Sequence, residues 1–208
     1  MTENHLWERH VDKTVQKLLE FLDTKQYGET IFLKVDYSLR VIITGMEKII
    51  LLCIFFGMAG YLTEFVAAFG VIIMLRSCTG GMHRETISGC FLQSLLNLSL
   101  IIFLGENIML QKGVCVFIAL VLMVLILYFA PIQSENRIQY SEKQRTGFKV
   151  KALVRVTVIL GSGICIPKEL YNIMMFAVFL HMLEMLFLCV RIQKKEVEQR
   201  DALYKTGN

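Results

Sequence analysis

An unbroken apolar run, VCVFIALVLMVLILYFA at residues 114–130, constrains the fold of this chain more than any other feature. A helix rises about 1.5 Å per residue, so roughly 20 apolar residues cross a hydrocarbon core about 30 Å thick. The 208-residue chain is 55% hydrophobic and only 19% charged, which is too apolar for an ordinary soluble domain. We therefore expect an integral membrane protein.

Further apolar segments predict an all-α fold, a polytopic membrane helix bundle of about six transmembrane helices. These segments are 91–105, 152–166 and 171–190, together with 41–75, which is too long for one span and which we divide near residues 62–64. No internal repeat or low-complexity tract separates a second domain, so a single integral domain, 1–208, is expected.

The distribution of Lys and Arg predicts the orientation of the chain. Six spans place both termini on one side of the membrane, and basic residues gather in the connection 131–151 and in the C-terminal tail. The predicted outer turns carry only Lys112 and Lys168. By the positive-inside rule we expect a multi-pass cell-membrane protein with both termini cytoplasmic. Its parts would be an interfacial segment 1–40, a six-span bundle 41–190 containing a cytoplasmic loop 76–90, and a basic tail 191–208.

The interfacial segment predicts an amphipathic helix, because apolar residues recur there at spacings of three and four. These residues are Trp7, Val11, Val15, Leu18 and Leu22. Such a face can lie on membrane lipid, or it can pack against its own bundle or a second subunit; the sequence favours neither.

Charge and cysteine usage limit the partners of the chain. The net charge of +4 is modest and spread over the polar ends, so no nucleic-acid partner is expected. Four of the six cysteines lie in apolar runs, while Cys78 and Cys90 flank the loop that we place in the reducing cytoplasm. We therefore expect free thiols rather than disulfides.

Reactive residue types concentrate in the predicted loop, RSCTGGMHRETISGC at residues 76–90. A thiol with a pKa near 8.5 is mostly protonated at neutral pH, so a catalytic cysteine needs a base or a nearby cation. His83 can be the base for Cys90 if the loop folds back, because a straight helix would separate them by about 10 Å. Cys90 would then lie in the first turn of the third span, where the helix N-terminus favours thiolate. The glycines that permit the turn are Gly80, Gly81 and Gly89.

Other interpretations of this loop stay open. It can be a solvated connection with an incidental cysteine, in a non-enzymatic peptide exporter or scaffold. Cys78, His83 and Cys90 are also candidate zinc ligands, but their spacing matches no familiar zinc motif, so no metal is expected. Cys78 is the main rival nucleophile, since it lies in the same segment.

The pattern Arg-x4-Gly-x-His-x6-Cys, formed by Arg76, Gly81, His83 and Cys90, resembles the motif of the accessory gene regulator B (AgrB) family of membrane cysteine endopeptidases. A second likeness follows the fourth span, where Tyr128-Phe129-Ala130-Pro131 precedes a polar stretch with Glu135 and Asn136. With the length, the span count and the amphipathic start, the resemblance covers nearly the whole chain.

The resemblance implies a function. Cys90, assisted by His83, would cleave the C-terminal tail of an AgrD-like precursor, a quorum-sensing propeptide, and retain the rest as a thioester. A cysteine of the precursor would then capture the acyl group and give a cyclic thiolactone peptide. The resemblance also suggests a homodimer, and we expect no cofactor.

The other polar residues of this region carry hypotheses with alternatives. Arg76 can bind the acidic tail of the precursor, support the loop through backbone carbonyls, or be solvated. Glu85 can orient His83 or be an ordinary loop charge. Gln93 and Ser94 follow Cys90 along one side of the third span, and can line the peptide site or hydrogen-bond between helices.

The last span carries two ionisable residues, His181 and Glu184, three residues apart on one helical face. Ionisable groups at membrane depth point to a functional cavity or to hydrogen bonds that stabilise the bundle. We prefer the stabilising role.

Overall fold

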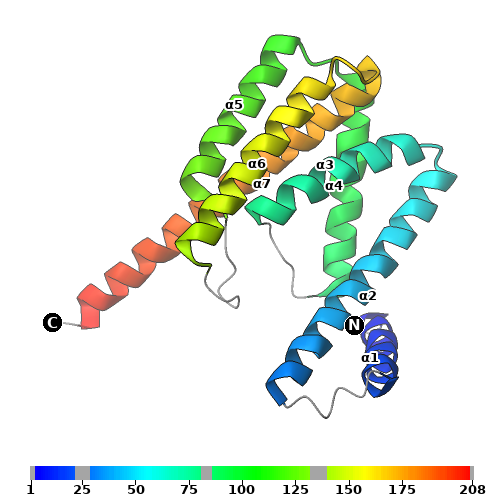
Figure 1. The fold of residues 1–208 in the computed structure, drawn as a ribbon, viewed down its shortest axis with the longest axis vertical. Helices are drawn as coiled ribbons and strands as arrows, with labels where there is room; N and C mark the ends of the chain where they lie inside the picture. The colour runs from blue at the N-terminus through cyan, green and yellow to red at the C-terminus, as the bar shows by residue number, and fades with distance from the viewer. Residues whose placement is uncertain (1–2, 22–28, 81–85, 132–139, 207–208) are drawn as a thin grey trace. The chain divides into compact units, whose positions relative to one another are not determined.

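The computed structural model spans residues 1–208 and describes all of them except 1–2, 22–28, 81–85, 132–139 and 207–208. The described residues form helices and a few short turns, with no strand among them (Figure 1). The helices are α1 (Glu3–Phe21), α2 (Glu29–Met58), α3 (Leu62–Thr79), α4 (Ile87–Asn107), α5 (Lys112–Phe129), α6 (Glu142–Ser162) and α7 (Lys168–Thr206).

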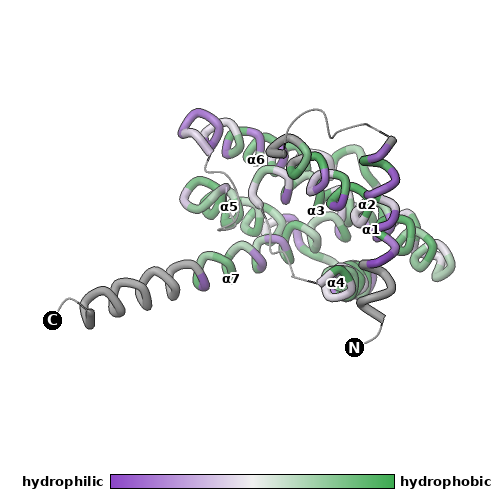
Figure 2. Tube along the Cα trace, turned by 90° about the horizontal axis from the view of Figure 1, so that it is seen from below, coloured by the Kyte–Doolittle hydropathy of each residue, from purple (hydrophilic) through white to green (hydrophobic). Residues whose placement is uncertain are grey.

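Five helices in the described part of the chain are long and apolar enough to cross a membrane. The candidate spans are Val35–Met58, Leu62–Thr79, Ile87–Asn107, Lys112–Phe129 and Lys168–Arg191. They are coloured mainly as hydrophobic in Figure 2. The predicted all-α polytopic membrane bundle is therefore confirmed, and these five spans coincide with five of the six predicted crossings.

The sixth predicted crossing, 152–166, lies in and just beyond α6, which is not among the five candidate spans. A capping box starts this helix early: Ser141 Oγ accepts from the Gln144 amide at 3.4 Å, and Gln144 Oε1 accepts from the Ser141 amide at 3.1 Å. The helix then carries basic residues before and within its apolar part and ends at Ser162. These basic residues are Lys143, Arg145, Lys149, Lys151 and Arg155.

The predicted division of 41–75 into two helices is confirmed, although the break lies slightly earlier than expected. Gly60 has a φ of +81°, a left-handed conformation that glycine adopts without strain. Its amide donates to the Gly57 carbonyl at 3.2 Å, and the Tyr61 amide donates to the Phe56 carbonyl at 2.9 Å. These bonds end α2 in a C-terminal cap.

By its internal contacts the chain divides into two compact units, which we describe separately. The first comprises Met1–Leu62 and His83–Leu96, and in it α1 packs against α2 (Figure 1). The buried apolar residues of α1 are Val11, Val15 and Leu19, which pack against Phe32, Val35, Leu39, Ile43 and Ile87. Of the alternatives left open for the amphipathic helix, packing against its own bundle is thus the one observed.

Two details of the amphipathic segment differ from the sequence prediction. Val11 and Val15 are buried as predicted, but the next buried residue is Leu19, while Leu18 is exposed. The predicted segment 1–40 is also not one helix, because α2 already begins at Glu29. Charge pairing supports this early start: Arg40 on α2 binds Asp36 one turn before it at 2.9 Å, and also Asp12 of α1.

The second unit comprises Thr63–Met82 and Asn97–Asn208, and in it α5, α6 and α7 lie side by side (Figure 1). Its α7 runs without interruption from Lys168 to Thr206, so the predicted basic tail continues the last helix. Gly105 of α4 lies directly against Ile173 of α7, since a Cβ at this glycine would be 2.5 Å from Ile173 Cγ1. The close approach therefore requires glycine.

Asn172 of α7 holds the turn between α4 and α5. Its Nδ2 donates to the Gly105 carbonyl at 2.6 Å and to the Ile108 carbonyl at 2.7 Å, and its Oδ1 accepts from the Leu110 amide at 2.9 Å. The side chain is only 4% exposed. One buried amide thus pairs three backbone groups that a helix end leaves without intrahelical partners.

Replacing Asn172 by Ala should destabilise the protein by about 2–3 kcal/mol, because the three backbone groups lose a partner in a buried site. The measurement is thermal unfolding of the purified protein in detergent. Asn107→Ala is the matched control, since Asn107 is exposed and bonds only one turn back, to the Phe103 carbonyl. The control should change stability by about 0.5 kcal/mol or less. Equal effects of the two substitutions would contradict this role for Asn172.

Candidate active site

Cys90 lies in the first turn of α4, the position that the sequence predicted for it. Thr86 precedes the helix and caps it, since its Oγ1 accepts from the Gly89 amide at 3.3 Å. The Cys90 amide donates to the Thr86 carbonyl at 3.0 Å, which is the first bond of the helix. Gly89 is therefore helical, and the prediction that it helps the chain to turn is wrong because the cap already starts the helix before it.

The segment 76–90, predicted as a loop, is helical at both ends. Helix α3 continues to Thr79 and closes at Gly80, whose φ is +84° and whose amide donates to the Arg76 carbonyl at 3.0 Å. Gly80 thus supplies the left-handed conformation predicted for it. The predicted residues Gly81, His83 and Glu85 lie outside the described residues, so the pairing of Cys90 with His83 stays a prediction.

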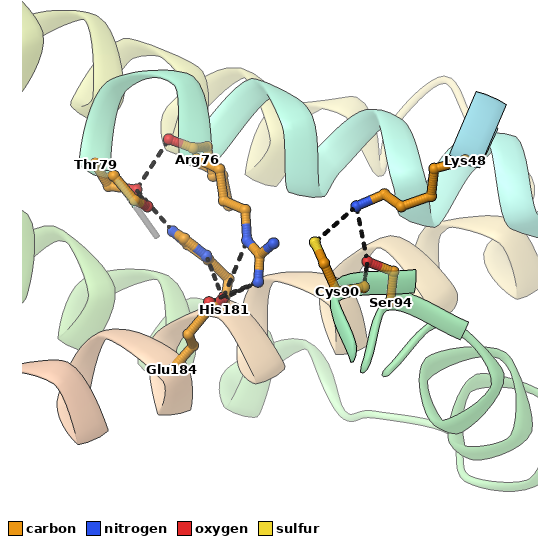
Figure 3. Close-up of polar contacts among 9 residues, drawn as sticks. Lys48, Arg76, Thr79, Cys90, Ser94, His181 and Glu184 are labelled. Carbon is orange, nitrogen blue, oxygen red and sulfur yellow. Dashed lines mark hydrogen bonds and ion pairs between the residues drawn. The ribbon is translucent and has the colours of Figure 1, made fainter. Parts of the chain in front are cut away.

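In the described part of the chain, the Cys90 sulfur contacts a side chain that the sequence prediction missed. Lys48, from α2, places its Nζ 3.4 Å from Cys90 Sγ and 3.1 Å from Ser94 Oγ (Figure 3). All three side chains are half-buried. An ammonium group beside a sulfur atom favours the thiolate form, which is the nucleophile.

Ser94, a predicted supporting residue, lies one turn after Cys90 and fixes the geometry of this group. Its hydroxyl donates to the Cys90 carbonyl at 2.9 Å, so its lone pairs are free to accept from Lys48. Ser94 therefore holds the ammonium beside the sulfur from the same helix face. Gln93, the other predicted residue of this helix, is half-buried three residues after Cys90.

Lys48 could have been found from one feature of the sequence. It lies inside the candidate span Val35–Met58, where a cation needs a polar partner. What the sequence does not contain is the identity of that partner, because Cys90 is 42 residues further along the chain.

A second polar group belongs to the other compact unit and joins α3 to α7. Arg76 makes a two-pronged ion pair with Glu184: Nη2 lies 2.6 Å from both carboxylate oxygens, and Nε lies 3.2 Å from Oε2 (Figure 3). The Arg76 side chain is 30% exposed and that of Glu184 is 13% exposed. Arg76 is thus bound to a carboxylate of its own bundle, a role that none of the sequence hypotheses assigned to it.

His181 completes this group. Its Nε2 lies 2.9 Å from Thr79 Oγ1, and the Thr79 hydroxyl lies 3.0 Å from the Leu75 carbonyl. The Thr79 hydroxyl has a single proton. If it donates that proton to the Leu75 carbonyl, the hydroxyl oxygen accepts from His181, and the ring proton of His181 lies on Nε2. His181 Nδ1 is 3.7 Å from Glu184 Oε2 and has no hydrogen-bond partner among the described residues. Both His181 and Glu184 thus make polar contacts within the second unit, as the preferred stabilising role requires, and that role stays a prediction.

All six cysteines are free thiols, as the sequence predicted. The rival nucleophile Cys78 is 3% exposed in α3, whereas Cys90 is half-buried. Burial therefore separates the two candidates. Among the described residues, no group of three His, Cys, Asp or Glu side chains is arranged to hold a metal ion.

The model of the family described as Accessory gene regulator B matches residues 11–188 of the chain. The chain belongs to the AgrB family. It is 26% identical over 162 residues to a putative AgrB-like protein of Listeria monocytogenes serovar 1/2a, covering 78% of this chain and 77% of that protein. A putative AgrB-like protein of Clostridium beijerinckii is 23% identical over 158 residues, covering 75% and 77%.

A more distant relative carries a different name. Protein FsrB of Enterococcus faecalis is 21% identical over 167 residues, covering 80% of this chain and 68% of that protein. No solved structure matches the chain. Membership of the AgrB family supports a role in the quorum sensing of the accessory gene regulator type, in a multi-pass membrane protein that associates with an AgrD-like propeptide.

The ion pair of Arg76 and Glu184 should stabilise this AgrB-family protein cooperatively. Arg76→Gln and Glu184→Gln should each cost about 2 kcal/mol, because each leaves a partly buried charge without its partner. The double variant should lose about 1 kcal/mol less than the sum of the single losses. Thermal unfolding of the four proteins in detergent measures the coupling, and Arg145→Gln, at an exposed position of α6, is the control. Strictly additive losses would show that the two groups do not interact.

Proposed function

We propose that this protein is a membrane cysteine endopeptidase that cleaves the C-terminal tail of an AgrD-like quorum-sensing propeptide. The nucleophile is Cys90 and the base is His83. One observation carries the proposal within the family: Cys90 is the partly accessible thiol in the first turn of a membrane helix, with a lysine ammonium 3.4 Å from its sulfur. A helix N-terminus and a nearby cation are surroundings in which reactive cysteines are found.

The proposed reaction has two acyl transfers. His83 takes the thiol proton, and the Cys90 thiolate attacks the carbonyl carbon of the peptide bond. The C–N bond then breaks, the imidazolium returns the proton to the leaving amine, and a thioester on Cys90 remains. In the second transfer, His83 takes the proton of a precursor thiol, whose sulfur attacks the thioester carbon and forms the thiolactone. The bond from that carbon to Cys90 breaks, and the released Cys90 thiolate regains a proton from the imidazolium.

The second transfer explains why a cysteine suits this task better than a serine. Passing an acyl group from one thiol to another exchanges a thioester for a thioester of similar energy. Hydrolysis would instead discard the activation of the acyl group, so a site at the end of membrane helices that limits access of water is favourable.

The remaining parts of the proposal concern placement and partners. We place both termini and the active-site segment in the cytoplasm, where the precursor is made, because basic residues gather in those parts of the sequence. This placement requires α6 to cross the membrane in addition to the five candidate spans. The protein acts as a homodimer in membrane lipid. Arg76, which binds Glu184 in the structure, retains a proposed second role in attracting the acidic tail of the precursor.

The competing function is a non-enzymatic membrane exporter or scaffold. In that case the segment after Gly80 only connects two helices, and Cys90 has the reactivity of an ordinary thiol. A covalent acyl intermediate on Cys90 separates the two functions, because a scaffold forms none.

Cys90→Ala and His83→Ala should each reduce cleavage of a co-expressed AgrD-like precursor by about 1,000-fold or more, because the reaction loses its nucleophile or its base. Mass spectrometry of the precursor measures cleavage, and the wild-type protein should carry an acyl group on Cys90 that hydroxylamine removes. Cys78→Ala is the matched control and should keep cleavage, since that thiol is buried. Normal cleavage by purified Cys90→Ala protein would reject the proposed function.

A further inference from the structure

We infer that Lys48 is a further catalytic residue, whose ammonium group holds the Cys90 sulfur as thiolate while it attacks and while it leaves. The inference rests on the proposed function and assigns a role to a residue outside the 76–90 segment. It starts from one contact between helices far apart in the sequence, Lys48 Nζ to Cys90 Sγ at 3.4 Å.

The position of Lys48 requires an explanation. It lies in the candidate span Val35–Met58 of α2, between Glu47 and an apolar run, and a lysine in such a span is unfavourable unless it has a polar partner. In the part of the chain that the structure describes, Lys48 makes no ion pair with a carboxylate within 4 Å. Its side-chain contacts there are with the Cys90 sulfur and the Ser94 hydroxyl.

The neighbouring carboxylate belongs to another contact. Glu47 Oε1 lies 3.6 Å from His10 Nε2 of α1, so Glu47 takes part in the packing of α1 on α2. Within the described residues, the anionic partner available to the Lys48 ammonium is thus the sulfur itself, once Cys90 has lost its proton. A nearby cation favours a thiolate over a thiol, and the Ser94 hydroxyl holds the Lys48 ammonium in place beside the sulfur.

Lys48 and His83 have different tasks in this scheme. The imidazole removes and returns the proton, while the ammonium stays protonated and stabilises the charge on sulfur. The same contact serves the second acyl transfer, in which the bond between the acyl carbon and Cys90 Sγ breaks and the electron pair returns to that sulfur. Lys48 therefore assists both transfers, because Cys90 is the nucleophile in the first and the leaving group in the second.

The test measures the reactivity of Cys90 directly, without any precursor. Full-length protein in membrane vesicles receives short pulses of iodoacetamide over a range of pH, and mass spectrometry follows Cys90 and the exposed Cys165 in the same molecule. The variants are Lys48→Met, which keeps a long apolar side chain suited to a membrane helix, and Lys48→Arg, which keeps the charge. Lys17→Met is the control, because it removes a lysine from an exposed position of α1.

In Lys48→Met, alkylation of Cys90 at neutral pH should slow by about tenfold or more, and its pH profile should move to higher pH. Cys165 should react at an unchanged rate, Lys48→Arg should restore most of the Cys90 rate, and Lys17→Met should match the wild type. Cleavage of a co-expressed precursor should fall with the Cys90 rate.

Two results would overturn the inference. The first is an unchanged rate and pH profile of Cys90 in Lys48→Met, including the case in which cleavage is lost, since Lys48 would then be structural. The second is slower alkylation of Cys90 in Lys48→Met that is not restored in Lys48→Arg. Failure of the proposed function is a separate result. Cleavage by the Cys90→Ala protein would reject the proposed peptidase function, whereas the alkylation profile still decides whether Lys48 stabilises the thiolate.

Discussion

A charged side chain in an apolar helix needs a polar partner on another segment, and this constraint governs the structure. Arg76 of α3 reaches Glu184 of α7, and Lys48 of α2 reaches Cys90 of α4. Exposure of such groups to hydrocarbon without partners would be unfavourable by several kcal/mol each. Apolar packing alone distinguishes poorly between helix pairs in lipid, so these polar contacts add specific links, between α3 and α7 in one unit and between α2 and α4 in the other.

Apolar periodicity predicted most of the fold because it reports directly on transfer into lipid. It identified five spans and the buried face of α1. It failed at helix ends, which depend on caps and ion pairs rather than on hydropathy. The Ser141 capping box starts α6 before its apolar segment, and the pairing of Arg40 with Asp36 and Asp12 carries α2 upstream of the predicted first span.

The candidate site was predictable only as far as it is local in sequence. The motif gave Cys90, and the glycine pattern gave Gly80, because spacing along the chain specifies both. Their long-range partners were not predictable. Lys48 precedes Cys90 by 42 residues and Glu184 follows Arg76 by 108, and such pairings are decided by how the helices pack.

The contact between Lys48 and Cys90 also suits the energetics of the proposed chemistry. A cation that stabilises a thiolate makes it somewhat less nucleophilic, but it makes the same sulfur a better leaving group. Any cysteine peptidase needs the second effect as well, because its sulfur leaves the acyl carbon whether water or a thiol takes the acyl group. An enzyme that passes the acyl group to another thiol needs both, since its cysteine must attack an amide and then leave from a thioester. A lysine fixed by Ser94 beside the sulfur serves both steps without having to move.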